Sequence, residues 1–233
     1  TFVREAHDRV KKINPKIELS AAVFKNPVQS GRFIGQRWHE WSRWIDIFMP
    51  MTYRSHFAGS FEDYLAHLTE VTARQLEWTR GEKPLYAGVA STYLYREEMQ
   101  PLEDLRERVT ELKTLPVTDV TARETKARAI AESYKALRVR LAQFAPERER
   151  ELELLVAPVA NSVSTATPEQ IEKLATALGQ LRRDLPPGFC PPDKLVRAIE
   201  AARQAKPDGV IIFSAGNLTI EKLWPTLEAA FKR

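Results

Sequence analysis

The chain has 233 residues, of which 35 are Lys or Arg and 31 are Asp or Glu, so its formal net charge is +4. A hydrophobic share of 43% excludes a disordered chain, and no apolar run approaches the roughly 18 residues that cross a bilayer. We therefore expect no membrane span. Because acids are interleaved with bases, we also expect no nucleic-acid partner. The single cysteine, Cys190, excludes an intrachain disulfide and a cysteine-rich metal site.

The first part of the chain alternates helices with short apolar strands. Phe2, Ala6, Val10 and Ile13 recur at helical spacing before Asn14 and Pro15 end the helix. The expected elements that follow are strands over 16–24, 44–53 and 85–91, a short tryptophan-rich helix over 36–43, and a helix that Ser60 caps and that runs to residue 81. Residue 1 is Thr and the first helix has no N-cap, which predicts that the chain was cut from a longer protein.

Residues 96–190 interrupt this alternation. The stretch 96–153 carries 12 basic and 13 acidic residues, which is typical of a solvated helical appendage. Two apolar stripes on either side of Pro116 predict an antiparallel helical hairpin, with Thr121 and Glu124 forming a capping box. Thr167 and Gln170 predict a second capping box at the start of a further helix.

The last part of the chain returns to the first pattern. Pro192 opens a helix, the turn over 207–209 leads into a strand over 210–214, and a final helix is expected over about 219–231. Continuous apolar strands that alternate with helices predict an α/β fold with a parallel sheet covered by helices. Such units fit an open sheet or an arc of a closed barrel, and no glycine-rich phosphate loop follows any strand.

The carboxylates near the strands have structural interpretations. Glu62 and Asp63 lie beside Ser60, where they cap the helix and complement its dipole. Asp46 lies near the N-terminal end of its strand, and we expect a buried hydrogen bond to satisfy it. A glycosidase needs two carboxyl groups across the scissile bond, and no strand here ends on one.

Other chemistries receive little support from the sequence. The four histidines have no metal-ligand spacing, and His56, which follows the second strand, is more typical of a loop histidine than of a catalyst. Ser91 and Ser214 lack the pattern of a nucleophile elbow. We therefore expect no metal and no cofactor.

Aromatic and basic residues at the strand ends are the stronger candidates for ligand binding. Tyr53 and Tyr93 each follow a strand and can offer a ring face or a hydroxyl to a sugar. Lys25 and Arg54 can contact hydroxyls or an acidic substituent. Trp38 shares a spacing of three residues with its neighbouring tryptophans, which fits either core packing or a side chain that faces the cleft.

Three segments resemble the bacterial glycosyl-hydrolase-like family ten, a family of (β/α)8 barrels. They are Gln36-Arg37-Trp38 with Trp41 and the following Ile45–Tyr53, the strand that ends at Phe24, and the strand Gly209–Ser214. Arg37 stands where the family has Asp, and Met51 stands where it has Gln. The likeness covers about residues 1–95 and 192–218.

The resemblance implies the C-terminal part of a TIM-like barrel, strands five to eight, with a helical insertion between the last two strands. Barrel units would occupy 1–95, the inserted subdomain 96–190, and the last barrel helix, strand and C-terminal helix 191–233. The implied function is a glycoside hydrolase acting on a polysaccharide or peptidoglycan-type glycan, exported from the cell, with its catalytic carboxylates upstream of residue 1. Carbohydrate contacts would come from the polar and aromatic side chains Lys25, Gln36, Trp38, Tyr53, Arg54 and Tyr93.

A second hypothesis comes from a different functional class. The chain can be a non-catalytic carbohydrate-binding or scaffold domain whose helices over 96–190 bind a protein partner. Under the half-barrel interpretation the first and fourth strands are unpaired edges, which predicts dimerisation or aggregation through them.

Overall fold

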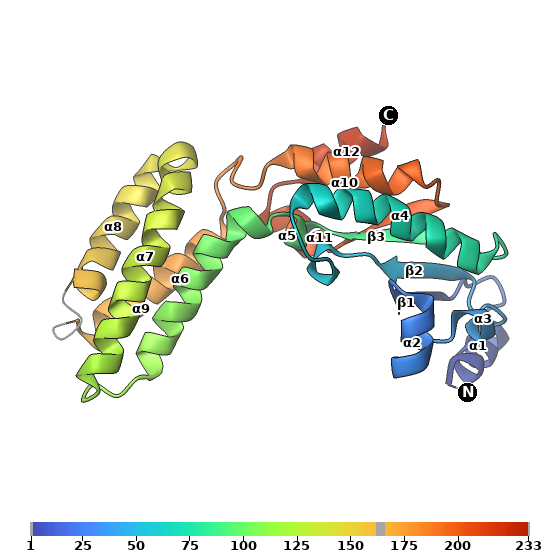
Figure 1. The fold of residues 1–233 in the computed structure, drawn as a ribbon, viewed down its shortest axis with the longest axis horizontal. Helices are drawn as coiled ribbons and strands as arrows, with labels where there is room; N and C mark the ends of the chain where they lie inside the picture. Colours follow the sequence, from blue (N-terminus) through green and yellow to red (C-terminus); the bar gives the residue numbers. More distant parts are fainter. Residues whose placement is uncertain (1, 162–165, 233) are drawn as a thin grey trace. The chain divides into compact units, whose positions relative to one another are not determined.

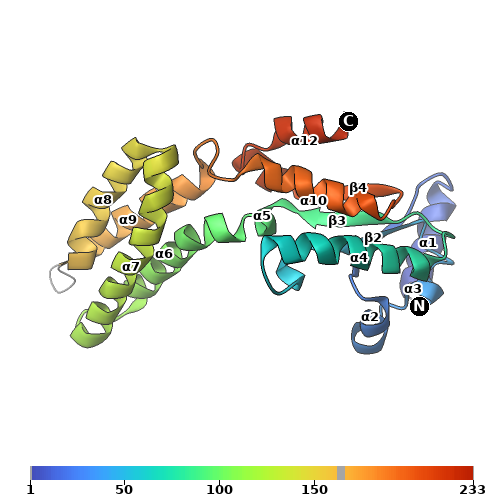
Figure 2. The same ribbon diagram turned by 45° about the horizontal axis from the view of Figure 1, so that its top comes forward.

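The computed structural model describes residues 2–161 and 166–232, which form two compact units. The sheet unit comprises residues 1–94, 193–217 and 225–233, and the helical unit comprises 95–192 and 218–224. Figure 1 and Figure 2 label the elements of both units.

Four parallel strands of five residues each form the centre of the sheet unit. They are β1 (Ser20–Phe24), β2 (Ile47–Met51), β3 (Tyr86–Ala90) and β4 (Gly209–Phe213), and all four lie within or beside the ranges that the sequence predicted. The helices around them are α1 (Phe2–Ile13), α2 (Pro27–Ile34), α3 (Trp38–Trp41), the 3-10 turn η1 (Arg54–His56), α4 (Phe61–Thr79), α5 (Ser91–Leu94) and α10 (Pro192–Gln204). Two further helices, α11 (Ala215–Ile220) and α12 (Trp224–Phe231), follow β4.

The prediction of a TIM-barrel half was wrong. Most of the described chain is helical, and its strands form two separate two-stranded parallel sheets, β1-β2 and β3-β4. Between β2 and β3 the structure has a single isolated bridge, Phe48 to Leu85. An apolar run predicts that a strand is buried, but it does not determine how many strands join one sheet.

Pro50 gives the physical reason for the break between the two sheets. The Phe48 N–H donates to Pro84 O at 2.9 Å, and the residue two positions on along the same edge of β2 is Pro50, which has no N–H to continue the ladder. The Thr52 hydroxyl replaces part of the lost pairing by donating to Gly88 O. Pro50 lies within the strand predicted over 44–53, so the residue that interrupts the pairing can be identified in the sequence.

An aspartate sets the register of each parallel pair. The Asp46 N–H donates to Leu19 O at 2.8 Å, and Asp46 Oδ2 accepts from the Leu19 N–H at 2.8 Å. Asp208 makes the same two contacts with Leu85, at 3.0 and 2.9 Å. We call each such pair of hydrogen bonds an aspartate clasp. It joins the residue before one strand to the residue before the neighbouring strand. Asp46 also accepts from Lys11 Nζ at 2.8 Å, so the predicted structural role of this carboxylate is confirmed.

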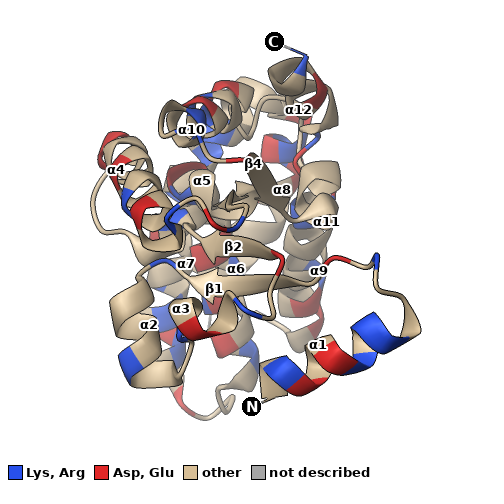
Figure 3. Ribbon diagram, turned by 90° about the vertical axis from the view of Figure 1, so that its right-hand side faces the viewer, with Lys and Arg blue, Asp and Glu red and all other residues tan. Residues whose placement is uncertain are grey.

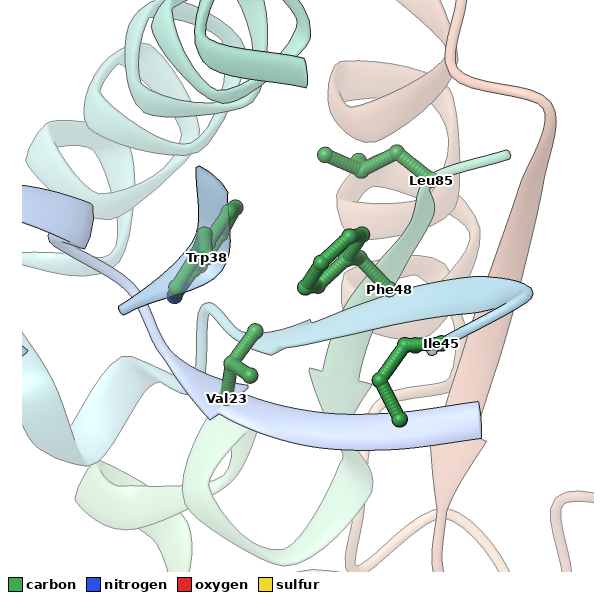
Figure 4. Packing of buried hydrophobic residues seen from close by; sticks show 5 residues of the cluster. All are labelled: Val23, Trp38, Ile45, Phe48 and Leu85. Atoms are coloured by element: carbon green, nitrogen blue, oxygen red, sulfur yellow. The ribbon is translucent and has the colours of Figure 1, made fainter. Parts of the chain in front are cut away.

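The core of the sheet unit lies between β1, β2, α3 and the start of β3. Val23, Trp38, Ile45, Phe48 and Leu85 pack together there, as Figure 4 shows. The rings of Trp38 and Phe48 are stacked, with centroids 5.3 Å apart. Charged side chains lie on the surrounding helices with acids and bases interleaved, while the strands carry none (Figure 3).

Helix α4 begins where the sequence predicted and is joined to α10. The Ser60 hydroxyl accepts from the Asp63 N–H, and the Asp63 carboxylate accepts from the Ser60 N–H, which completes the capping box. The Thr69 hydroxyl donates to Ala201 O at 2.9 Å, and Arg197 forms an ion pair with Glu62. The predicted capping role is confirmed for Asp63, whereas Glu62 lies in the first turn of α4 and forms an ion pair with Arg197 that was not predicted.

The helical unit is a four-helix arrangement. It contains α6 (Arg96–Thr114), α7 (Val120–Phe144), α8 (Pro146–Asn161) and α9 (Pro168–Arg183). Helices α6 and α8 each contact both α7 and α9, and the four lie side by side in Figure 1 and Figure 2. The predicted hairpin corresponds to α6 and α7, whereas α8 was not predicted from the sequence.

Two helix starts were predicted in this unit with different success. Thr167 and Gln170 form the expected capping box at α9. At α7 the predicted box of Thr121 and Glu124 was wrong, because the helix begins earlier and Asp119 accepts from the Ala122 N–H. Asp119 lies two residues before Thr121, and Asp is as good an N-cap residue as Thr.

Candidate functional site

Five aromatic side chains gather at the carboxyl ends of the four strands. Phe24 and Phe213 are the last residues of β1 and β4, Tyr53 and His56 follow β2, and Tyr93 lies in the short helix α5 after β3. Parallel strands place their carboxyl ends at one edge of a sheet, so residues distant in sequence meet there. We call this group the Tyr53 ring surface.

Tyr53 is at the centre of the Tyr53 ring surface. Its ring centroid lies 5.8 Å from that of His56, 6.4 Å from that of Tyr93 and 5.6 Å from that of Phe213. The rings of Phe24 and His56 are 6.1 Å apart. The two rings of each of these four pairs are close to parallel, with interplanar angles between 16° and 28°.

The Tyr53 ring surface is open to solvent. Phe24 is 44% exposed, Tyr93 43% and Phe213 51%, while Tyr53 and His56 are half-buried. Burial raises the pKa of the Tyr53 phenol above its ordinary value, and the neighbouring Tyr93 phenol raises it further. Tyr53 therefore stays a neutral hydrogen-bond donor at physiological pH.

Lys25 lies beside this surface, but its ammonium group makes internal contacts. Lys25 Nζ donates to His56 O and lies 3.7 Å from the centroid of the Phe57 ring. Its backbone oxygen accepts from Gln75 Nε2 at 2.7 Å. Burial lowers the pKa of Lys25. Lys25 thus ties the end of β1 to η1 and α4.

Gln36 and Arg54 support the surface from within the fold. Gln36 Oε1 accepts from the Phe24 N–H at 2.8 Å, which fixes the end of β1. Arg54 is 4% exposed, and its Nη1 donates to Leu94 O at 3.4 Å. Both were expected to contact a ligand. In the structure Gln36 bonds the backbone of β1, and Arg54 bonds a backbone oxygen of α5 and lies 5.8 Å from the centroid of the Phe61 ring.

Trp38 lies away from the other candidate residues. It is 2% exposed and packs in the core against Phe48, on the inner side of β2 (Figure 4). Of the two interpretations of the tryptophan spacing, core packing is the one that the structure supports. Of the six candidates, Tyr53 and Tyr93 belong to the Tyr53 ring surface and Lys25 borders it.

Sequence reasoning missed three members of the site. Phe24 was recognised as the end of its strand but was not proposed as a ligand contact, and Phe213 was assigned only to a strand. His56 was interpreted as a loop histidine because no partner stood near it in sequence. Its two ring neighbours, Phe24 and Tyr53, come together with it only in the folded chain.

No carboxylate contacts the five rings within residues 2–161 and 166–232, to judge by their ring contacts, hydrogen bonds and ion pairs. The same part of the chain contains no group of three or more metal-ligating side chains. Nor does any helix described there combine the length and hydropathy required to cross a bilayer. The chemistry that the site offers is thus aromatic stacking with a few hydrogen bonds.

Comparison with known proteins adds no family to this description. No family model matches the chain, and neither a curated protein nor a solved structure matches it.

Proposed function

We propose that the sheet unit binds a carbohydrate on the Tyr53 ring surface. The observation that carries this proposal is the exposure of three large aromatic side chains at the carboxyl ends of the strands of both sheets, each about half open to solvent. Exposed apolar patches of this kind usually mark a binding site, since single exposed aromatics are common but clustered ones are not. The apolar face of a sugar ring stacks on aromatic rings, and phenol hydroxyls then bond the sugar oxygens.

The geometry favours binding over hydrolysis. Asp46, Glu62 and Asp63 are the carboxylates that come closest in sequence to the end of β2, and each is engaged in the aspartate clasp, an ion pair or a helix cap. Hydrolysis of a glycosidic bond needs an acid and a second carboxylate on opposite sides of the bond. Binding needs only the rings that the unit already presents.

Binding of soluble oligosaccharides to the full chain tests the proposal. Ligand-observed NMR against a panel of oligosaccharides identifies a binder, and titration calorimetry then compares variants. Tyr93→Ala and Phe213→Ala should each weaken binding about tenfold, equivalent to about 1.4 kcal/mol, which is within the range for one aromatic contact. Both side chains are half exposed, so their removal should leave folding intact.

Phe33→Ala is the matched control. Phe33 is 73% exposed on α2 of the same unit, and its ring contacts Arg32 rather than the Tyr53 ring surface. Its removal should leave affinity unchanged. Equal losses in all three variants, or no binding by any oligosaccharide, would contradict the proposal. New reducing ends in the same samples would indicate hydrolysis instead.

A further inference from the structure

The polar groups beside the Tyr53 ring surface determine which glycans it can accept. The two nearby cations, Lys25 and Arg54, are directed inward. The Lys25 ammonium bonds His56 O and lies over the Phe57 ring. Arg54 is buried and reaches Leu94 O. The ammonium of Lys25 and the guanidinium of Arg54 are thus each held by contacts within the sheet unit.

His56 contributes a hydrogen-bond acceptor to the surface. Its Nδ1 lies 2.9 Å from Met51 O, and a carbonyl oxygen accepts but never donates, so Nδ1 carries the proton. In the neutral imidazole Nε2 is then a lone-pair acceptor. Within the described chain Nε2 has no hydrogen-bond partner and is not among the fully buried unpartnered atoms, so it is the ring atom that remains to accept a hydrogen bond from a ligand.

The orientation of this imidazole is held by its neighbours. The His56 ring is stacked between those of Phe24 and Tyr53, at 6.1 and 5.8 Å, and its Nδ1 is anchored to the backbone. The faces of these rings carry partial negative charge, and so does the Nε2 lone pair. Both attract C–H and O–H groups and repel a carboxylate.

We propose that the Tyr53 ring surface selects uncharged sugars over acidic ones, with His56 Nε2 accepting a hydrogen bond from a sugar hydroxyl. This inference rests on the proposed function. It assigns the stacking to the rings of Tyr53, Tyr93 and Phe213 and the polar contact to His56. It also assigns Lys25 a positioning role rather than a contact with ligand.

Charge-matched oligosaccharides test the selectivity. Neutral hexasaccharides of the cellulose and chitin types and an anionic hexasaccharide of galacturonic acid are titrated against the full chain at about pH 8. The anionic ligand should bind at least tenfold more weakly than the better neutral one. Equal or tighter binding of the anionic ligand, weakening with salt, would overturn the inference and leave the proposed function standing. Failure of all three ligands would count against the proposed function itself.

His56→Phe tests the acceptor. The variant keeps an aromatic ring between Phe24 and Tyr53 and removes both nitrogens, and we expect a five- to tenfold loss of affinity for the neutral hexasaccharide, which is about 1 to 1.4 kcal/mol. An O-methylated form of the same sugar lacks hydroxyl donors, so the wild type and His56→Phe should bind it equally. Because the variant also loses the Met51 contact, its thermal unfolding is measured alongside. An unchanged affinity for the unmodified sugar, or an equal loss for the methylated one, would refute the role of Nε2.

Discussion

Removal of the Asp46 carboxylate should destabilise the sheet unit by about 2 to 3 kcal/mol. Oδ2 accepts two hydrogen bonds, from the Leu19 N–H and from Lys11 Nζ, both at 2.8 Å. A hydrogen bond to a charged group contributes about 1.5 to 3 kcal/mol. The side chains of Lys11 and Asp46 are 23% and 28% exposed, so solvent screens their pair and the lower part of that range applies. Asp46→Ala removes both bonds, whereas Asp46→Asn keeps an oxygen for Leu19 and should cost about 1 kcal/mol.

Urea unfolding followed by tryptophan fluorescence measures these costs. Four of the five tryptophans lie in the sheet unit, so the signal reports mainly on it: Trp38, Trp41, Trp44 and Trp78. Asp208→Asn is the matched comparison, because Asp208 makes the same clasp with Leu85. It should cost less than Asp46→Asn, since Asp46 also bonds Lys11. A change of less than about 0.5 kcal/mol in the free energy of unfolding of Asp46→Ala would show that the clasp does not stabilise the fold.

The same carboxylate gives a pH dependence with a definite sign. Burial raises the pKa of Asp46, but the hydrogen bonds from Lys11 and the Leu19 N–H outweigh it, and the pKa in the folded state lies below its ordinary value. A group whose pKa is lowered by folding contributes stability above its unfolded pKa, about 3.9. The stability difference between wild type and Asp46→Asn should therefore be constant from about pH 7 to 5 and shrink as the pH falls through the folded pKa. A difference that grew on acidification would show that the sign is wrong.

Three further variants or reagents examine other contacts. Gly88→Ala should destabilise by about 1 to 3 kcal/mol in urea unfolding, because a Cβ there would lie 2.4 Å from Pro50 O; a neutral result would contradict this close approach. Tyr64→Phe should cost about 1 kcal/mol in the same assay, since the buried hydroxyl donates to Thr52 O at 3.1 Å. Burial raises the pKa of the Cys190 thiol, so a thiol reagent should label it far more slowly in the native chain than in urea, and equal rates would be inconsistent with its burial.

Local structure in this protein follows closely from local sequence. The ranges of α1 and all four strands, and the capping boxes at Ser60 and Thr167, agree with patterns that involve neighbouring residues. Such signals are strong because side-chain spacing and cap chemistry act within a few residues. The structural role of Asp46 was predictable for the same reason, since an acid at the start of an apolar strand must find a partner.

The arrangement of the strands was not predictable in this way. Pro50 removes one N–H from the edge of β2, and that single missing donor divides the expected continuous sheet into two pairs. The apolar pattern of the sequence does not reveal this missing hydrogen bond, because apolar residues indicate burial and not backbone pairing. The helix α8 was missed because residues 147–151 are all charged and its apolar residues lie only from 152 onward, beside Pro158, so its stability comes from packing against α7 and α9.

The candidate site shows the same division between sequence and tertiary structure. The sequence by itself determined that aromatic residues, and not carboxylates, follow the strands, and it singled out Tyr53 and Tyr93. Only the tertiary structure decided that Phe24, His56 and Phe213 join them, and that the Lys25 and Arg54 side chains are directed inward. The physical reason is that parallel strands bring their carboxyl ends together from positions far apart in the chain, so the neighbours of each ring are set by strand order and register rather than by sequence spacing.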